Sequence, residues 1–380
     1  MKAFEPATML ADDWRDGLFL GRIETAEGPT PVLLKGGILH DMSRVAPTAS
    51  QIIADRAFDA SAGSALGDFD TLTLAADAIP RLLSPVDLQC VKAAGVTFAV
   101  SAVERVIEER ARGDAGKAAE VRAMLESRIG GGIRGLRPGS PEAMALKQAL
   151  IDEGMWSQYL EVAIGPDAEI FTKSPVLSTV GWGAEIGVRS DSSWNNPEPE
   201  IAILADSHGE PVGACLGNDV NLRDFEGRSA LLLGKAKDNN ASCSLGPFVR
   251  LFDASFTMDD VRVAEVDLLI EGEDGYVLKG HSSMHEISRD PTDLVAQAMS
   301  EHHYPDGYIL FLGTLFAPTQ DRDDPGRGFT HKVGDVVTIS TPKLGKLVNR
   351  VTHSKSAAPW TLGIAGLMQN LVSRGLIGAR

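Results

Sequence analysis

Residues 194–205 read WNNPEPEIAILA, and residues 212–224 read VGACLGNDVNLRD. Each stretch contains an apolar run of the length expected for a buried strand. Between the two runs lie residues 207–211, SHGEP, which are turn formers. We therefore expect the runs to pair as an antiparallel hairpin.

Three carboxylates flank these runs. In an extended strand the side chains at i and i+2 share a face, so Glu198 and Glu200 can point the same way while Pro199 points the other. The hairpin would bring Asp219 beside them and give three oxygen donors with no sulfur or imidazole. Such a set suits Mg²⁺, Mn²⁺ or Ca²⁺ rather than Zn²⁺. The alternative is an edge strand with solvated acids, which Pro197 and Pro199 also favour.

The composition is that of a protein with a large core. The chain has 380 residues, of which 43% are hydrophobic and 23% charged, and two domains are expected. Its formal charge of −16 argues against nucleic acid or an anionic membrane surface as a partner, since both would repel it. An anionic substrate would need local neutralisation by a metal or by basic side chains.

The cysteines indicate a reducing compartment. Cys90, Cys215 and Cys243 have neither the number nor the spacing of a disulfide framework or a zinc site. The first residues contain no apolar signal core, and no stretch reaches the roughly 20 apolar residues of a membrane-spanning helix. We expect a cytoplasmic protein.

The first half of the chain predicts a small β-rich domain followed by helices. Residues 1–85 contain short apolar runs separated by turn formers, with a helix expected near residues 50–56. Residues 103–160 are rich in good helix formers and predict a helical insertion. We expect the insertion to belong to a second domain over residues 86–380, which also carries the three carboxylates.

The second half predicts mainly strands. They are expected at 169–173, 185–188, 201–204, 212–216, 266–271, 307–312 and 336–341. One clear helix interrupts them at 291–299, with Asp290 as its cap, and a closing helix is expected at 359–372. The pattern predicts a β-dominated α+β fold, with neither βαβ alternation nor a glycine-rich nucleotide fingerprint.

A series of motifs resembles the fumarylacetoacetate hydrolase superfamily from about residue 86 to the C-terminus. In order, they are Glu198-Pro199-Glu200, Gly217 to Asp224, Gly234 to Asp238, Leu245 to Phe248, Gly313-Thr314 and Gly334 to Val337. The resemblance implies a mixed β-sandwich roll and a Mg²⁺ or Mn²⁺ ion held by Glu198, Glu200 and Asp219. It also implies a small 2-oxo acid or 1,3-dicarbonyl acid as substrate, and a homodimer or homotetramer.

Within the superfamily the chain most resembles the bacterial 2-keto-3-deoxy-D-xylonate and 2-keto-3-deoxy-D-arabinonate dehydratases. The related hydrolases carry a water-activating His and Glu three residues apart, at positions that correspond to Ser101 and Glu104 here. Without an imidazole, water attack on a C–C bond lacks its usual general base. The resemblance therefore implies dehydration of 2-keto-3-deoxy-D-pentonate to 2,5-dioxopentanoate. The alternatives are a C–C hydrolase of an acylpyruvate or a 2,4-diketo-3-deoxy sugar acid, and a non-catalytic module with a structural metal.

Two catalytic residues are expected on this basis. Glu169 ends a strand expected beside the metal and is the candidate base at C3, because a carboxylate in a partly closed site can be tuned to accept a proton near neutral pH. It could equally be a further metal ligand or a surface acid. Lys235 is the candidate cation for the substrate's oxo or carboxylate group and for protonation of the departing hydroxyl.

The remaining candidates bind the substrate or orient the acids. Arg189 could clamp a carboxylate, Thr314 could offer a hydroxyl and a backbone N–H, and Ser101 is a third candidate contact. For Arg223 we expect a bridge to the metal-binding carboxylates.

Overall fold

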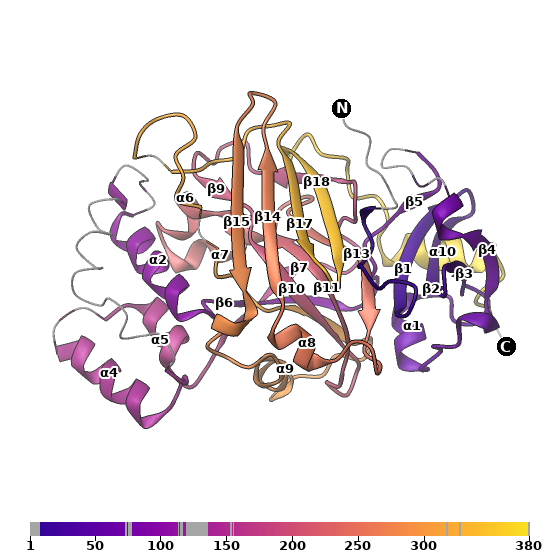
Figure 1. Cartoon of the computed structure of the whole chain (residues 1–380), viewed down its shortest axis with the longest axis horizontal. Coiled ribbons are helices and arrows are strands. Elements are labelled where there is room, and N and C mark those ends of the chain that lie inside the picture. Colours follow the sequence, from indigo (N-terminus) through magenta and orange to yellow (C-terminus); the bar gives the residue numbers. More distant parts are fainter. Residues whose placement is uncertain are drawn as a thin grey trace.

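Two β-sheets packed face to face form the centre of the molecule (Figure 1). The computed structural model describes residues 8–378 apart from 73, 75–77, 113, 115–116, 119–135, 153, 155, 317 and 327. Within these residues the larger sheet has eleven strands, and its order is β4-β3-β2-β1-β13-β11-β10-β16-β6-β7, with β5 paired to β1. The strands are β1 (Leu18–Thr25), β2 (Gly28–Lys35), β3 (Ile38–Asp41), β4 (Ser64–Asp68), β5 (Arg81–Leu82), β6 (Cys90–Gly95), β7 (Glu169–Ser174), β10 (Pro199–Ala205), β11 (Pro211–Asp219), β13 (Cys243–Leu251) and β16 (Tyr308–Phe311).

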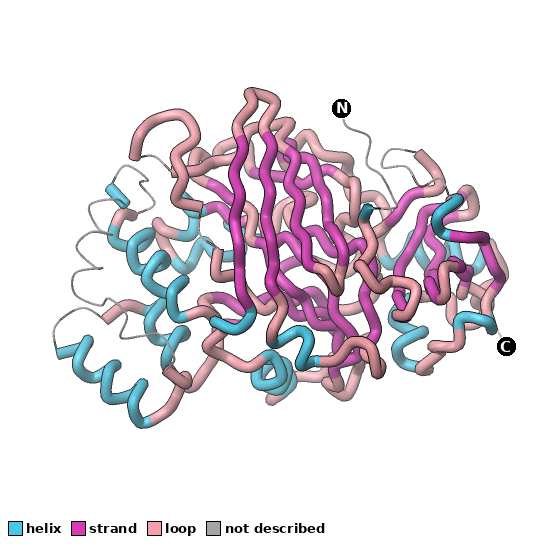
Figure 2. Tube along the Cα trace, viewed as in Figure 1, coloured by secondary structure: helices cyan, strands magenta, loops and turns pink. Residues whose placement is uncertain are grey.

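The smaller sheet has the order β15-β14-β17-β18-β8, and a two-stranded ladder pairs β9 with β12. These strands are β8 (Glu185–Val188), β9 (Asn195–Asn196), β12 (Asn221–Leu222), β14 (Glu265–Glu271), β15 (Val277–Ser283), β17 (Val336–Thr341) and β18 (Gly345–His353). Figure 2 shows that strands dominate the described chain, so the predicted β-dominated α+β fold is confirmed.

Apolar side chains from both sheets fill the space between them. Ile201 and Leu216 of the larger sheet and Leu268, Ile270 and Ile339 of the smaller one belong to a single buried cluster. In β14 every second residue is buried, as expected for a sheet with one solvated face. In β10 and β13 every residue is buried, because these strands are covered on both faces.

The N-terminal strands extend the larger sheet. β1 pairs with β13 through Phe19↔Arg250 and Leu20↔Val249, and α1 (Ala49–Ala54) covers the face opposite the smaller sheet, packing Ile52 into a second buried cluster. The C-terminal helix α10 (Ile364–Ser373) lies against these strands (Figure 1), where Asn370 donates a hydrogen bond to the carbonyl of Glu27 (2.7 Å). The domain boundary at residue 85 stays a prediction.

Helices gather at the opposite end of the molecule (Figure 2). They are α2 (Ala99–Arg110), α4 (Pro141–Asp152) and α5 (Gln158–Ile164), which share a buried cluster. They lie in or next to the range 103–160 that was predicted to be helical, of which residues 113, 115–116, 119–135, 153 and 155 lie outside the described chain. That this range is an insertion stays a prediction. The remaining helical elements are α6 (Arg223–Glu226), α7 (Leu233–Lys237), α8 (Met258–Arg262), α9 (Pro291–Met299) and the short 3₁₀ turns Ala60–Ala62, Phe69–Thr71, Ala230–Leu232 and Met284–Glu286.

Two sequence signals for helices can be checked directly. α9 begins as predicted, with the carboxylate of Asp290 accepting a hydrogen bond from the N–H of Thr292 (2.8 Å). The closing helix, expected at 359–372, is observed as α10 and begins five residues later. None of the helices in the described part of the chain combines the length and the apolar character needed to cross a membrane.

Candidate active site

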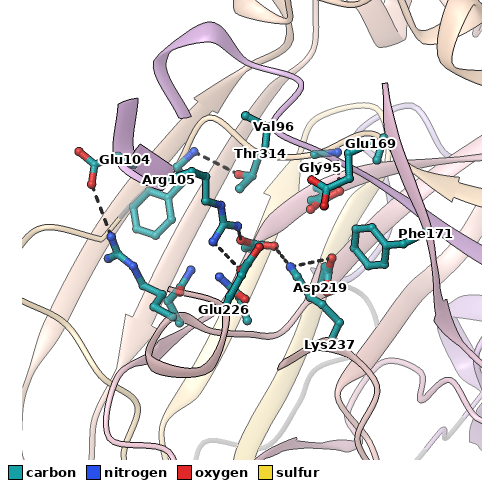
Figure 3. Close-up of a pocket in the computed structure, with 18 of the residues that line it drawn as sticks. Gly95, Val96, Glu104, Arg105, Glu169, Phe171, Asp219, Glu226, Lys237 and Thr314 are labelled. Carbon is teal, nitrogen blue, oxygen red and sulfur yellow. Dashed lines mark hydrogen bonds and ion pairs between the residues drawn. The ribbon is translucent and has the colours of Figure 1, made fainter. Parts of the chain in front are cut away.

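A pocket rich in ionisable groups lies beside the β9–β12 ladder (Figure 3). Its volume is about 580 Å³, including the part that is open to solvent. The ionisable residues among the described lining are Glu104, Arg105, Glu169, Glu198, Glu200, Asp219, Arg223, Glu226 and Lys237. They come from α2, β7, β10, β11, α6, α7 and the turn before β10.

The register of the β10–β11 hairpin brings three of the carboxylates together. Glu200 lies opposite Gly217, and the same register places Glu198 opposite Asp219, whose N–H donates to the carbonyl of Glu198 (3.1 Å). One carboxylate oxygen from each of the three lies within 4.8 Å of the others, and all three side chains are buried. β10 is an interior strand between β11 and β16, so these acids are not the solvated acids of an edge strand.

Two buried lysines neutralise part of this charge. The ammonium of Lys237 donates to Glu198 and to Asp219 (3.0 Å to the latter; Figure 3). Lys173, which is fully buried on β7, forms an ion pair with the other oxygen of Asp219 (2.9 Å). Burial opposes the effect, but these two lysines lower the pKa of Asp219.

Glu200 receives less compensation. Its carboxylate accepts a hydrogen bond from the N–H of Gly313 (2.6 Å). Burial, followed by the negative charges of Asp219 and Glu198, raises the pKa of Glu200 well above its usual range. Without a cation, Glu200 therefore holds a proton more readily than an ordinary carboxylate does.

The charge balance of the whole pocket fits a divalent cation. With all six lining carboxylates ionised, Arg105, Arg223, Lys237 and the adjoining Lys173 supply four positive charges, which leaves an excess of two negative charges for protons or a cation to balance. Buried charges are costly unless they are paired or coordinate a metal. An all-oxygen donor set of Glu198, Glu200 and Asp219 suits Mg²⁺ or Mn²⁺.

Glu169 reaches the pocket from the first residue of β7. It lies opposite Gly95 of β6, and a Cβ atom on Gly95 would stand 2.1 Å from the Glu169 carboxylate. The glycine thus makes room for the acid to lie over β6 in the pocket. Burial raises the pKa of Glu169, although the charges of Arg105 and Lys237 oppose the shift. A carboxylate of this kind can accept a proton nearer to neutral pH than an exposed one.

Helix α2 contributes a cation that the sequence did not single out. Arg105 donates to Glu198 (2.7 Å) and to the buried carboxylate of Glu226 (2.6 Å). The carbonyl of Glu226 also accepts a hydrogen bond from Tyr159 of α5 (3.4 Å). The helical insertion is therefore connected directly to one of the candidate metal ligands.

Thr314 lies in the pocket, as expected for a substrate contact. Its hydroxyl oxygen accepts a hydrogen bond from the N–H of Phe316 (3.1 Å), so its own proton can be donated to a ligand. Arg223 also lines the pocket, where its guanidinium stacks on Trp194 (4.3 Å) and donates to Glu104 (3.4 Å). The bridge that we expected from Arg223 to the metal-binding carboxylates stays a prediction.

Two of the expected cations do not reach this pocket, and their assignment is corrected. Lys235 is exposed and lies over the ring of Phe225 (5.3 Å); Lys237 takes the buried position. The two lysines are two residues apart on α7, so their side chains point about 200° apart around the helix axis and cannot both face the pocket. Arg189 pairs instead with the exposed carboxylate of Asp191 (2.7 Å). The side chain of Ser101 lies outside the part of the chain that the structure describes, although its backbone belongs to α2.

Four charged residues of the site were not predicted from the sequence: Lys237, Lys173, Arg105 and Glu226. Lys237 belongs to the motif GKAKD at residues 234–238, two residues after Lys235. The motif does supply a lysine to the pocket, but this lysine is Lys237 and not Lys235. Lys173 is the last residue of the strand predicted at 169–173, but no role was assigned to it. Arg105 and Glu226 had no local signal, because each is one charged residue among several on a helix.

Comparison with known proteins identifies a family and two relatives. The family model described as Fumarylacetoacetate (FAA) hydrolase C-terminal matches residues 149–352. The chain is 32% identical over 201 residues to the probable 2-keto-3-deoxyxylonate dehydratase of Haloferax volcanii, covering 53% of this chain and 66% of that protein. It is 31% identical over 186 residues to the 2-dehydro-3-deoxy-D-arabinonate dehydratase of Saccharolobus solfataricus, covering 48% and 58%. The matches thus span less than two thirds of the length of these relatives.

Solved structures share the fold. The structure of 2-keto-3-deoxy-D-arabinonate dehydratase complexed with magnesium and 2,5-dioxopentanoate superposes with a TM-score of 0.62 at 23% identity, covering 88% of this chain and 98% of that one. The fumarylacetoacetate hydrolase of Exiguobacterium antarcticum gives a TM-score of 0.53 at 16% identity, covering 88% and 99%. Both likenesses confirm the predicted fold. With a family match over more than half of its residues, the chain belongs to the fumarylacetoacetate hydrolase family.

Proposed function

We propose that the protein is a metal-dependent hydro-lyase that dehydrates 2-keto-3-deoxy-D-pentonate to 2,5-dioxopentanoate. The observation that carries the proposal is one pocket that holds an all-oxygen metal-binding group, a half-buried carboxylate with a raised pKa and a buried lysine, while none of its described lining residues is a histidine. The names of the two relatives, both dehydratases of 2-keto-3-deoxy pentonates, support the same reaction.

Glu198, Glu200 and Asp219 would hold the metal, for which Mg²⁺ is the first candidate. The solved neighbour that binds magnesium supports this choice. When bound, a divalent cation would act as a Lewis acid toward the neighbouring oxygens of a 2-oxo acid and so acidify C3. These three carboxylates orient the bound acid by fixing where the cation sits.

Glu169 is positioned to take the proton from C3. Its raised pKa makes it a stronger base than an ordinary carboxylate, and its place over Gly95 fixes the direction of its oxygens. Lys237 can hold a proton for the C4 hydroxyl, which then leaves as water. Loss of the C3 proton and the C4 hydroxyl removes one water molecule from the five-carbon acid, and tautomerisation toward C5 yields 2,5-dioxopentanoate.

Elimination fits these residues better than hydrolysis does. Hydrolysis of a C–C bond needs a group that activates an attacking water, usually an imidazole. The corresponding position is Ser101, and a serine has no protonation change near neutral pH. Elimination needs only a base at C3 and an acid near C4.

The test is incubation of the purified protein with 2-keto-3-deoxy-D-xylonate and 2-keto-3-deoxy-D-arabinonate, with and without Mg²⁺. The proposal predicts Mg²⁺-dependent formation of 2,5-dioxopentanoate, abolished by a chelator and restored by Mg²⁺ or Mn²⁺. Parallel incubations contain an acylpyruvate and a 2,4-diketo-3-deoxy sugar acid. Cleavage of either, with the 2-keto-3-deoxy acids untouched, would instead assign a C–C hydrolase.

We also propose that the protein acts as a homodimer or homotetramer in the cytoplasm. The resemblance to the family supports the assembly, and three free cysteines, two of them buried, support a reducing compartment. Light scattering after size exclusion would test the assembly, and a monomer at micromolar concentration would exclude it.

A further inference from the structure

Two asparagines in the pocket carry polar atoms that the protein leaves unpaired. Asn196 is 3% exposed and Asn221 is 1% exposed, and both line the pocket. Oδ1 of Asn196 and both Oδ1 and Nδ2 of Asn221 are buried without a hydrogen-bond partner among the described residues. A buried polar atom without a partner costs about 1–3 kcal/mol, so its retention needs an explanation.

The strand register places these asparagines beside the metal-binding carboxylates. Asn196 of β9 lies directly opposite Asn221 of β12. The register continues that of the β10–β11 hairpin, in which Glu198 faces Asp219, so each asparagine is two residues along the chain from a carboxylate, across the break between the ladder and the hairpin. All four side chains line the same pocket. The asparagine pair is therefore the next row of its surface.

The amides offer hydrogen bonds that suit a hydroxyl group. Nδ2 of Asn196 donates to the carbonyl of Pro197 (2.9 Å), which fixes this amide so that its oxygen is the atom left open. Asn221 presents both an acceptor and a donor. A hydroxyl donates one hydrogen bond and accepts others, so it can donate to the amide oxygen of Asn196 while it accepts from Nδ2 of Asn221. A carboxylate, which only accepts, cannot pair with either amide oxygen.

The reaction selects which hydroxyl of the substrate is involved. In a 2-keto-3-deoxypentonate the C4 hydroxyl must leave, so the C5 hydroxyl is the one that the substrate keeps through the elimination. Two residues of strand separate the asparagine row from the carboxylate row by about 6.6 Å. The C5 oxygen is four bonds from C2 and reaches about 5 Å in an extended acid, and a hydrogen bond of up to about 2.8 Å extends this reach past the separation of the rows.

We propose that Asn196 and Asn221 bind the C5 hydroxyl and so make the enzyme selective for a sugar acid over a 2-oxo acid with an alkyl end. The inference rests on the proposed function, and it identifies the C5 hydroxyl as the part of the substrate that the two asparagines recognise. A site built to hydrogen-bond a hydroxyl strongly rejects the analogue that lacks it, because the buried polar groups are then left unpaired.

The experiment compares two substrates that differ in one oxygen atom. 4-Hydroxy-2-oxopentanoate retains the keto acid and the C4 hydroxyl but has a methyl group at C5, and its dehydration gives 2-oxopent-3-enoate. We expect the wild type to prefer 2-keto-3-deoxypentonate by about 10²-fold or more in kcat/KM. Asn221→Leu and Asn196→Leu, which keep the side-chain size, should each reduce this preference at least about tenfold.

Controls separate recognition of the hydroxyl from damage to the site. Each variant is checked by thermal unfolding and by calorimetric titration with Mg²⁺, and Asn221→Ser replaces the leucine variant if that protein does not fold. Asn370→Leu makes the same change on α10, where Asn370 bonds Glu27 far from the pocket, and its preference should equal that of the wild type.

Two outcomes would overturn the inference while the proposed function stands. The first is a wild type that dehydrates both substrates equally well. The second is a set of asparagine variants that lose activity on both substrates by the same factor, with or without weaker Mg²⁺ binding, since the pair would then serve the metal or the shared keto acid. A wild type that dehydrates neither substrate refutes the proposed function itself, and this inference with it.

Discussion

Replacement of Lys237 by methionine should affect metal binding and turnover in opposite directions. The ammonium of Lys237 contacts Glu198 and Asp219, two of the three acids whose oxygens converge within 4.8 Å. A cation bound by these acids would therefore lie close to a fixed positive charge. Methionine keeps the length of the side chain and removes the charge.

The magnitude follows from the electrostatics of the pocket. Two unit charges about 4 Å apart interact by about 4 kcal/mol at an effective dielectric constant of about 20, and the interaction doubles for a divalent ion. Much of this is offset, because without Lys237 the metal-free acids can take up a proton instead. We expect a net gain of about 1.5–3 kcal/mol, so Mg²⁺ should bind roughly 10- to 100-fold more tightly.

Calorimetric titration with Mg²⁺ in the absence of substrate measures the first effect. Turnover of 2-keto-3-deoxypentonate at saturating Mg²⁺ measures the second, and it should fall by about 10²-fold or more because the acid near C4 is lost. Lys235→Met is the matched control on the same helix. Since Lys235 is exposed, its loss should change Mg²⁺ affinity less than about twofold. Weaker Mg²⁺ binding by Lys237→Met would refute the reasoning.

Three further predictions follow from the same contacts. Glu200→Gln should weaken Mg²⁺ binding and lower activity at least about tenfold, whereas unchanged metal affinity would remove Glu200 from the ligand set. Glu169→Gln should lower kcat by about 10²-fold with Mg²⁺ still bound. Because burial raises the pKa of Glu169, kcat/KM of the wild type should fall on acidification at a pH above the usual pKa of a carboxylate. A fall centred near pH 4 would contradict this. Asp13→Asn should destabilise the fold by about 3 kcal/mol in urea unfolding, because it leaves the buried charge of Arg250 without its carboxylate. Burial opposes the shift, but hydrogen bonds from Arg250 and Lys343 lower the pKa of Asp13 to about 2. The wild type should therefore lose this stabilisation as the pH falls from about 4 to about 2. If the variant lost the same stability over this pH range, the Asp13–Arg250 pair would not be its source.

The elements of the second half could be predicted because their signals are local. Alternation and turn residues located β8 and β17 at their observed bounds and placed β10 and β11 to within a few residues. The convergence of the three acids also followed from local rules: the i and i+2 positions of Glu198 and Glu200, and a hairpin to Asp219. The register of the β10–β11 hairpin follows from the same local signals. Its continuation places Asn196 opposite Asn221.

The cations of the pocket depend on tertiary packing, which the sequence did not reveal. Lys235 and Lys237 belong to one short helix, and only its docking decides which of them is buried. Arg105 is one of several charged residues on α2, and it reaches Glu198 because the insertion folds back over the pocket. β13 was not predicted because Pro247 lies within it. The N-terminal strands join the larger sheet by pairing with β13, so this contact was not predicted either.

The most direct test of the proposed reaction is to follow all five carbons of the substrate. Uniformly ¹³C-labelled 2-keto-3-deoxy-D-pentonate is incubated with the protein and Mg²⁺, and the products are identified by NMR. We expect one labelled product, 2,5-dioxopentanoate, with every carbon–carbon bond intact, and no product in the presence of chelator. Labelled pyruvate together with a two-carbon aldehyde, or an unchanged substrate beside efficient cleavage of an acylpyruvate, would contradict it.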